Sequence, residues 1–112
     1  MAEFRLNLLP GCALVTVSGE VDVATAPALG EAIWEGLVQS PRIVVDLKGV
    51  RFIDSTGLRV LVTAQKHAQQ DGGCLTLIQP PRIMWRVLQA MQMDQILPVR
   101  WDLAEAVAEA SQ

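Results

Sequence analysis

The chain has 112 residues, of which 51% are hydrophobic, and a formal net charge of −3 at pH 7. This length fits one domain, and the apolar fraction is high enough for a packed core, which excludes intrinsic disorder. Acidic and basic residues are mixed along the whole chain, so no basic face for a nucleic-acid backbone is predicted. We therefore expect residues 1–112 to form one globular domain without a nucleic-acid partner.

No targeting or membrane segment is predicted. The N-terminus lacks a basic stretch followed by a long apolar run, and no apolar stretch approaches the roughly 20 residues of a membrane helix. Cys12 and Cys74 lie far apart in apolar, strand-like segments. We expect them to be small buried side chains in a reducing compartment rather than a disulfide or metal ligands. The expected location is the cytoplasm.

The first third of the chain predicts a β-hairpin followed by a helix. Apolar and polar residues alternate over 4–8 and again over 13–19, and Pro10-Gly11 between them is a turn signal. Thr25 is a candidate helix N-cap, and Pro27 suits the first turn of that helix. Ser40-Pro41 marks its end.

Strands and helices alternate in the rest of the chain. We expect a strand buried on both faces over 42–47, a loop over 48–53, a helix from Asp54-Ser55 to 71–73, and a buried strand over 74–78. A third helix after Pro80-Pro81 has an apolar stripe, and an extended piece over 96–99 precedes a final helix over 103–110. This order predicts an α/β fold, with a small mixed sheet and about four helices. The stripe consists of Ile83, Met84, Val87, Leu88 and Met91.

Asp54, Ser55, Thr56 and Gly57 stand where the second helix begins. The first turn of a helix presents unpaired backbone N–H groups and a partial positive charge. Asp54 or Ser55 could therefore cap the helix. Alternatively, Ser55 could accept a phosphoryl group, whose oxygens the N–H groups would bind. Position alone leaves both uses open, and capping is the commoner one.

Ser55 is not predicted to be a catalytic nucleophile. The single histidine, His67, follows twelve positions later on the same predicted helix. At 1.5 Å per residue the two lie about 18 Å apart, far beyond hydrogen-bond reach. Ser55 also lacks the preceding glycine of a nucleophile elbow. We expect no catalytic residues, and His67 is interpreted as a surface or half-buried helix residue.

The acidic residues Asp22, Asp46 and Asp54 raise the alternative of a divalent-metal site like that of receiver domains. Such domains open with a buried strand and an acidic pair, whereas this chain opens with an amphipathic hairpin. We expect Asp46 to end its strand and bond to nearby backbone. No glycine-rich phosphate loop occurs. The sequence therefore predicts neither a metal nor a cofactor.

The stretch from the apolar strand ending in Asp46 to Asp54-Ser55-Thr56-Gly57-Leu58 resembles the signature of the STAS family. This domain is shared by sulphate transporters and anti-sigma factor antagonists. The segment 19–27 resembles the family's Gly-Glu-Leu-Asp approach to its first helix, and 94–99 resembles its closing short strand. The similarity covers nearly the whole chain and implies a STAS fold.

The resemblance to stand-alone antagonists implies a partner-switching cycle. The unmodified protein would bind an anti-sigma factor and thereby release a sigma factor. The anti-sigma factor would also be a serine kinase that phosphorylates Ser55, with Thr56 as a second candidate acceptor, and a serine phosphatase would reverse the modification. The implied partner-binding residues are Asp22, Asp54, Ser55, Thr56 and Gly57. The sequence leaves open whether the chain forms a homodimer.

A second function class fits the same motif. Some STAS domains are subunits of lipid or solute transport assemblies of the ABC type, or scaffolds of stress-signalling complexes. In these proteins the serine corner docks an ATPase or stays unmodified. The motif residues do not separate the two classes.

Overall fold

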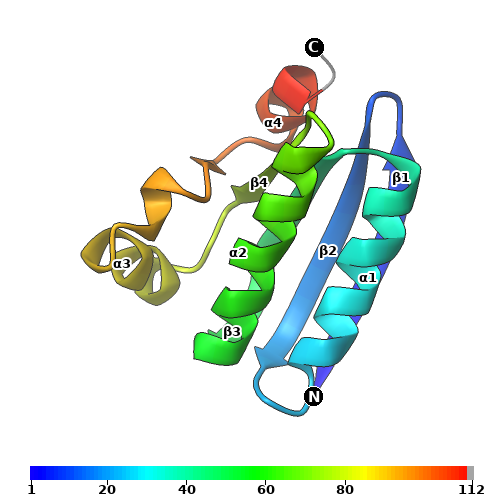
Figure 1. The fold of residues 1–112 in the computed structure, drawn as a ribbon. Coiled ribbons are helices and arrows are strands. Elements are labelled where there is room, and N and C mark those ends of the chain that lie inside the picture. Colours follow the sequence, from blue (N-terminus) through cyan, green and yellow to red (C-terminus); the bar gives the residue numbers. More distant parts are fainter. Residues whose placement is uncertain (111–112) are drawn as a thin grey trace.

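The computed structural model describes residues 1–110, which form a five-stranded sheet, four α-helices and one short 3-10 helix (Figure 1). The sheet has the strand order β1-β2-β3-β4-β5. The strands are β1 (Ala2–Leu9), β2 (Cys12–Val21), β3 (Arg42–Ile53), β4 (Cys74–Ile78) and β5 (Val99–Arg100). The helices are α1 (Ala26–Gln39), α2 (Ser55–Gln70), α3 (Arg82–Ala90), η1 (Met93–Gln95) and α4 (Leu103–Ala110).

The mixed α/β sheet predicted from the sequence is confirmed. β1 and β2 pair antiparallel and form the opening hairpin, whose turn contains Gly11 with a φ of 86°. This left-handed conformation carries no steric penalty for glycine. β2, β3, β4 and β5 pair in parallel, and the connections run through α1, α2 and the segment containing α3.

The expected loop over residues 48–53 is wrong, because β3 continues to Ile53. The segment pairs with the second half of β2, from Ser18 beside Gly49 to Val21 beside Ile53. Two register shifts interrupt this pairing and give the segment its irregular pattern of exposed and buried residues. Asp46 therefore lies within the strand and not at its end.

Helices cover both faces of the sheet. α1 and α2 lie side by side on one face, where the larger core cluster contains Ile43, Val45 and Leu47 of β3 (Figure 1). α4 packs on the other face, where Val44 contacts the smaller cluster around Ala106. β3 is thus buried on both faces over residues 43–45, as its β-branched run predicts.

The apolar stripe predicted for the third helix is only partly buried. Met84 and Leu88 reach the core, whereas Ile83 is 78% exposed and Met91 62% exposed. The reason is position: α3 lies beside the sheet rather than over it and buries a single ridge (Figure 1). The extended piece expected over 96–99 is also shifted, because the strand that pairs with β4 is Val99–Arg100.

Both cysteines are free thiols, with Cys12 buried and Cys74 half-buried. Burial raises the pKa of the Cys12 thiol, because the charged thiolate is poorly solvated there. Within residues 1–110, no helix has the length and apolar character needed to cross a membrane.

Candidate functional site

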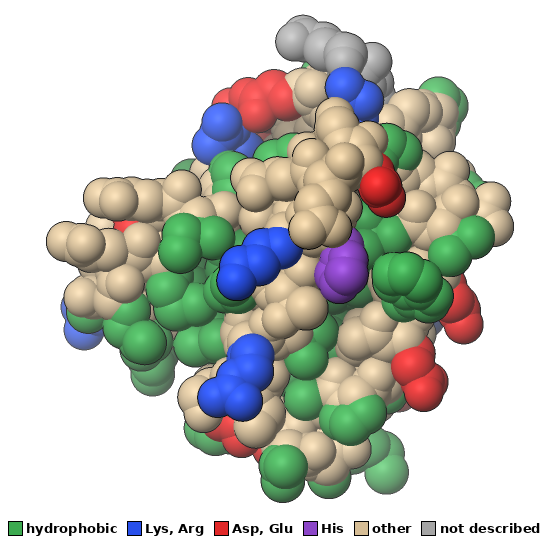
Figure 2. Space-filling view, viewed as in Figure 1, with side chains coloured by type: hydrophobic (Ala, Val, Ile, Leu, Met, Phe, Trp, Pro, Cys, Tyr) green, Lys and Arg blue, Asp and Glu red, His purple; other side chains and the backbone are tan. Residues whose placement is uncertain are grey.

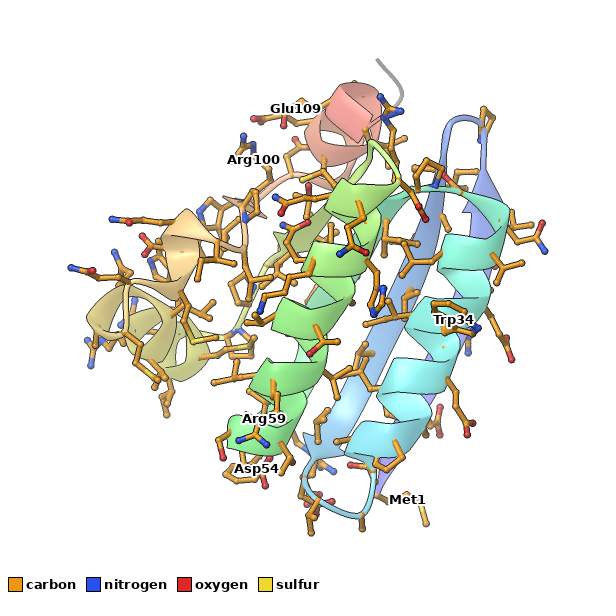
Figure 3. The ribbon with its side chains drawn as sticks, in the orientation of Figure 1. Met1, Trp34, Asp54, Arg59, Arg100 and Glu109 are labelled. Carbon is orange, nitrogen blue, oxygen red and sulfur yellow. The ribbon has the colours of Figure 1, made fainter. Side chains whose placement is uncertain are left out.

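The carboxyl ends of β2 and β3 meet at one edge of the sheet. Val21 pairs with Ile53 at the ends of the two strands, and the Asp54 N–H donates to the Val21 carbonyl at 3.1 Å. The loop that begins at Asp22 therefore lies next to the first turn of α2. Figure 3 shows Asp54 and Arg59 at this end of α2.

Asp54 is the N-cap of α2. Its Oδ1 accepts hydrogen bonds from the N–H of Thr56 at 2.9 Å and of Gly57 at 3.3 Å, and also from the Thr56 hydroxyl. The bond from the Thr56 hydroxyl, followed by the two backbone donors, lowers the pKa of the Asp54 carboxyl. Asp54 thus satisfies the backbone donors of the first turn as a carboxylate.

The Ser55 side chain is exposed, and among the described residues its hydroxyl makes no hydrogen bond. The sequence left open whether Asp54 or Ser55 caps the helix, and the structure assigns that role to Asp54. Ser55 is therefore not needed to hold the first turn. Its hydroxyl faces solvent at the positive end of the helix.

Thr56 and Gly57 have different tasks from Ser55. The half-buried Thr56 hydroxyl is engaged with the Asp54 carboxylate. Gly57 is buried, and a Cβ at this position would lie 2.6 Å from Cγ1 of Ile53 and 2.8 Å from Cγ1 of Val21. Glycine is required here because any side chain would push α2 away from the ends of β2 and β3.

Asp22 organises the neighbouring loop. Its Oδ1 accepts from the N–H groups of Ala24 at 3.0 Å and Thr25 at 3.1 Å. Thr25 occupies the N-cap position of α1, as predicted, but its side chain does not cap the helix. The Thr25 hydroxyl instead donates to the Glu20 carbonyl at 2.9 Å and accepts from the Asp22 N–H. The two side chains together close the turn between β2 and α1.

Two further residues singled out by the sequence lie away from this corner. Asp46 lies within β3, where its Oδ1 accepts from the Lys48 N–H at 2.9 Å, so the expected bond to nearby backbone is confirmed. His67 is exposed three turns along α2, with its ring edge-on to Trp34 at 6.0 Å between centroids. Within residues 1–110 no three His, Cys, Asp or Glu side chains are grouped so that they could hold a metal ion.

The sequence did not predict the apolar surface that flanks Ser55. Val23 is 73% exposed and lines a groove with Thr56. On the other side of the first turn of α2, Phe52 and the exposed Ile83 line a second groove. Neither Ile83 nor Phe52 had a local signal for its exposure. Ile83 belongs to the apolar stripe of the third helix, and its exposure depends on where α3 lies beside the sheet. The exposure of Phe52 depends on the pairing of β3 with β2.

The family model of the STAS domain, which describes the sequences of that family, matches residues 3–110 of the chain. Among curated proteins, the anti-sigma-B factor antagonist of Bacillus subtilis is 40% identical over 85 residues, which cover 76% of this chain and 78% of that protein. The anti-sigma-F factor antagonist RsfB of Mycobacterium tuberculosis is 43% identical over 61 residues. That alignment covers 53% of this chain and spans half (50%) of the length of RsfB.

A solved structure gives the same result for the fold. The crystal structure of an anti-sigma factor antagonist from Mycobacterium paratuberculosis superposes with a TM-score of 0.89 at 26% sequence identity. The superposition covers 100% of this chain and 96% of that one. With the mixed sheet, the capped α2 and the Asp-Ser-Thr-Gly-Leu corner in place, the chain belongs to the STAS domain family.

Proposed function

We propose that this chain is an anti-sigma factor antagonist in the cytoplasm and that phosphorylation of Ser55 switches off its binding to an anti-sigma factor. One observation carries the proposal: the Ser55 hydroxyl is exposed and unbonded among the described residues, at the start of a helix that Asp54 already caps. The names of the relatives from Bacillus subtilis and Mycobacterium tuberculosis support the same function. We infer a binding protein and not an enzyme.

The surroundings of Ser55 suit a surface that a partner buries. Val23 and Phe52 expose apolar side chains on either side of the first turn of α2, and apolar side chains at such positions favour association. The proposed partner-binding set is Asp22, Asp54, Ser55, Thr56 and Gly57. Asp22 acts mainly by fixing the turn between β2 and α1, and Gly57 by allowing α2 to approach the ends of β2 and β3.

Phosphorylation acts through charge. It adds about −2 at Ser55, at the positive end of a helix whose first turn is held by Asp54, so the modification need not unfold the helix. A partner seated on this corner would have to desolvate that charge, at a cost on the order of several kcal/mol. Since about 1.4 kcal/mol is a tenfold change in affinity, this cost is enough for a switch.

We further propose that the anti-sigma factor is itself the serine kinase and that a serine phosphatase restores the active form. Thr56 is the second candidate acceptor. Its hydroxyl is bonded to Asp54, so a kinase would first have to break that contact. Ser55 carries no such restraint and is therefore the preferred acceptor.

The test is capture of partners from the cytosol of the source organism by the tagged chain, with and without ATP. Mass spectrometry then identifies both the captured proteins and the modified residue. We expect an anti-sigma factor kinase without ATP, and a phosphoryl group on Ser55 with loss of that kinase when ATP is present. Ser55→Ala should keep the kinase bound under both conditions, and Thr63→Ala, at another exposed hydroxyl of α2, should behave like the wild type.

Two results would contradict the proposal. The first is equal phosphorylation of the Ser55→Ala variant at another residue. The second is capture of a transport ATPase in place of a kinase, which would assign the chain to the transport-subunit class.

A further inference from the structure

α1 and α2 line an open groove that borders the Ser55 corner at Val23 and Thr56, and most of its length is not used by the proposed switch. Its volume is about 510 Å³, within the range of about 300–1,000 Å³ that small-molecule pockets occupy. The floor is apolar, with Ala26, Ile33 and Ala64 buried beneath it, and Val60 forms part of one wall. Figure 2 views this face, with His67, the purple side chain, near one end of the groove.

Gly30 keeps the middle of the groove open. It lies within α1, where glycine weakens a helix relative to alanine. A Cβ at Gly30 would meet only Cγ1 of Val60 at 3.7 Å, an ordinary contact, so the packing of the two helices does not require glycine. The missing side chain instead leaves space inside the groove.

The charge along the groove is one-sided. Arg59 is the charged side chain that lines it, and within residues 1–110 no acidic side chain does. Arg59 makes no ion pair or hydrogen bond within the described part of the chain, and its guanidinium is always charged. Thr56 lines the same end, but its hydroxyl donates to Asp54, so Arg59 supplies the contact to an anion. Figure 3 shows Arg59 close to the start of α2. This end is suited to an anion and the remainder to an apolar chain.

The length of the groove limits what can occupy it. Arg59 and His67 are eight positions apart on α2, which corresponds to about 12 Å along the helix. Toward the far end the exposed Trp34 ring stands in a T-shaped pair with His67, and both line the groove. A straight chain of about this length with one negative head group matches both the single cationic end and the apolar floor.

We propose that the groove binds a free medium-chain carboxylate, with the head group on Arg59 and the chain lying over Val60 and Ala64 toward Trp34. The head group is held by a charge-assisted, bidentate contact with the guanidinium. The chain is held by burial against the apolar floor. Ser55 lies one helical turn before Arg59, so a phosphoryl group there would compete with the carboxylate for the guanidinium. The titration below uses the unmodified chain, so its outcome does not depend on whether Ser55 is phosphorylated in the cell.

The test is titration of the ¹⁵N-labelled full chain with decanoate below its micelle concentration, followed by amide NMR. Decanol, with the same chain and no charge, is the matched probe. We expect saturable shifts at the Gly30 and Val60 amides and at the Trp34 indole N–H. Arg59→Gln should weaken decanoate binding at least about tenfold and leave decanol binding unchanged, since only the charged contact is lost.

A pair of variants at Gly30 tests the location. Gly30→Leu fills the groove and should abolish the shifts, whereas Gly30→Ala adds only the tolerated Cβ and should keep them. Arg59→Gln, at an exposed position, keeps the test valid if Gly30→Leu does not fold. The proposal is overturned if decanoate causes no saturable shift at Gly30 or Val60, or if decanol binds as tightly as decanoate. It is also overturned if Gly30→Leu blocks capture of a protein partner while decanoate leaves the spectrum unchanged, because the groove is then a protein-docking surface.

Discussion

At the scale of single residues, two neighbours at the start of α2 have different roles: Asp54 caps the helix, and Ser55 presents an exposed hydroxyl. Asp54 holds the turn through the backbone N–H groups of Thr56 and Gly57. Ser55 lies between Asp54 and Thr56 in sequence, and its side chain makes no hydrogen bond within the described residues. A change of charge at Ser55 can therefore alter the affinity for a partner without unfolding α2.

The charge on Asp54 makes the stability of the wild type depend on pH. The pKa of Asp54 is lowered in the folded state. The stabilisation of the fold by the ionised carboxylate is therefore fully present above the pKa of 3.8 in the unfolded chain, and it is lost as the pH falls through the lower pKa of the folded chain. Asp54→Asn keeps a capping oxygen and has no charge to lose. The free energy of unfolding of both proteins should therefore be measured in urea between about pH 6 and 3. The value for the wild type should fall relative to that of the variant as the pH decreases. A difference in the free energy of unfolding between the two proteins that stays constant with pH would mean that the carboxylate is not the capping species.

Ser55→Ala and Gly57→Ala should differ sharply in stability. Ser55→Ala removes an unbonded exposed hydroxyl, so the free energy of unfolding should change by less than about 0.5 kcal/mol. Gly57→Ala places a Cβ against Ile53 and Val21 and should cost about 1–3 kcal/mol. Urea denaturation measures both values. A loss of stability in Ser55→Ala as large as that in Gly57→Ala would contradict the roles given to the two positions.

At the scale of elements, α2 is fastened to the sheet by one buried amide. β5 pairs only with Leu77 and Ile78, so the same edge of β4 is uncovered at Leu75. The fully buried Gln65 side chain takes the place of a neighbouring strand there. Its Oε1 accepts from the Leu75 N–H at 2.8 Å. Its Nε2 donates to the carbonyls of Leu75 and Ile96. This contact fixes the helix that carries Ser55 relative to β4.

Gln65→Leu should lower the free energy of unfolding by about 2–3 kcal/mol, because it removes the partner of the buried Leu75 N–H and the donor to the Ile96 carbonyl. Chemical denaturation monitored by circular dichroism measures the loss. Gln69→Leu, at an exposed position of the same helix, is the control and should change stability little. Equal stability of the wild type and Gln65→Leu would show that water replaces the amide at no cost.

The order of the elements and the start of α2 could be predicted from the sequence because both depend on local signals. Alternating polarity, the Pro10-Gly11 turn and the capping motif are all short-range. Residues 48–53 were wrongly predicted as a loop because their charged and glycine residues form a strand only through pairing with β2. The exposure of Ile83 likewise depends on where α3 lies beside the sheet. The groove between α1 and α2 arises from the spacing of two helices, and no local pattern encodes it.

At the scale of the whole molecule, the two faces of the sheet have separate tasks. α1 and α2 cover the face that carries the Ser55 corner and the groove, and α4 covers the other face near the opposite end of α2 (Figure 1). Ala106 of α4 packs in the cluster that contains Cys12 and Leu14. α4 therefore stabilises the sheet without approaching the site.

Removal of residues 103–112 should uncover the thiol of Cys12. Burial raises the pKa of Cys12, so exposure should lower that pKa and increase the thiolate fraction at a given pH. In a Cys74→Ser background, the labelling rate of Cys12 at neutral pH should rise at least about tenfold. Mass spectrometry of timed samples measures this rate. An unchanged rate would show that α4 does not protect this face of the sheet.

A negative charge on Ser55 is proposed to prevent association with the anti-sigma factor. Calorimetric titration of that partner tests this with the chain in three forms: unmodified, stoichiometrically phosphorylated on Ser55, and Ser55→Ala. We expect the Ala variant to bind like the unmodified chain and the phosphorylated chain to bind at least about 100-fold more weakly. Equal affinity of the phosphorylated and unmodified chains would contradict this proposal.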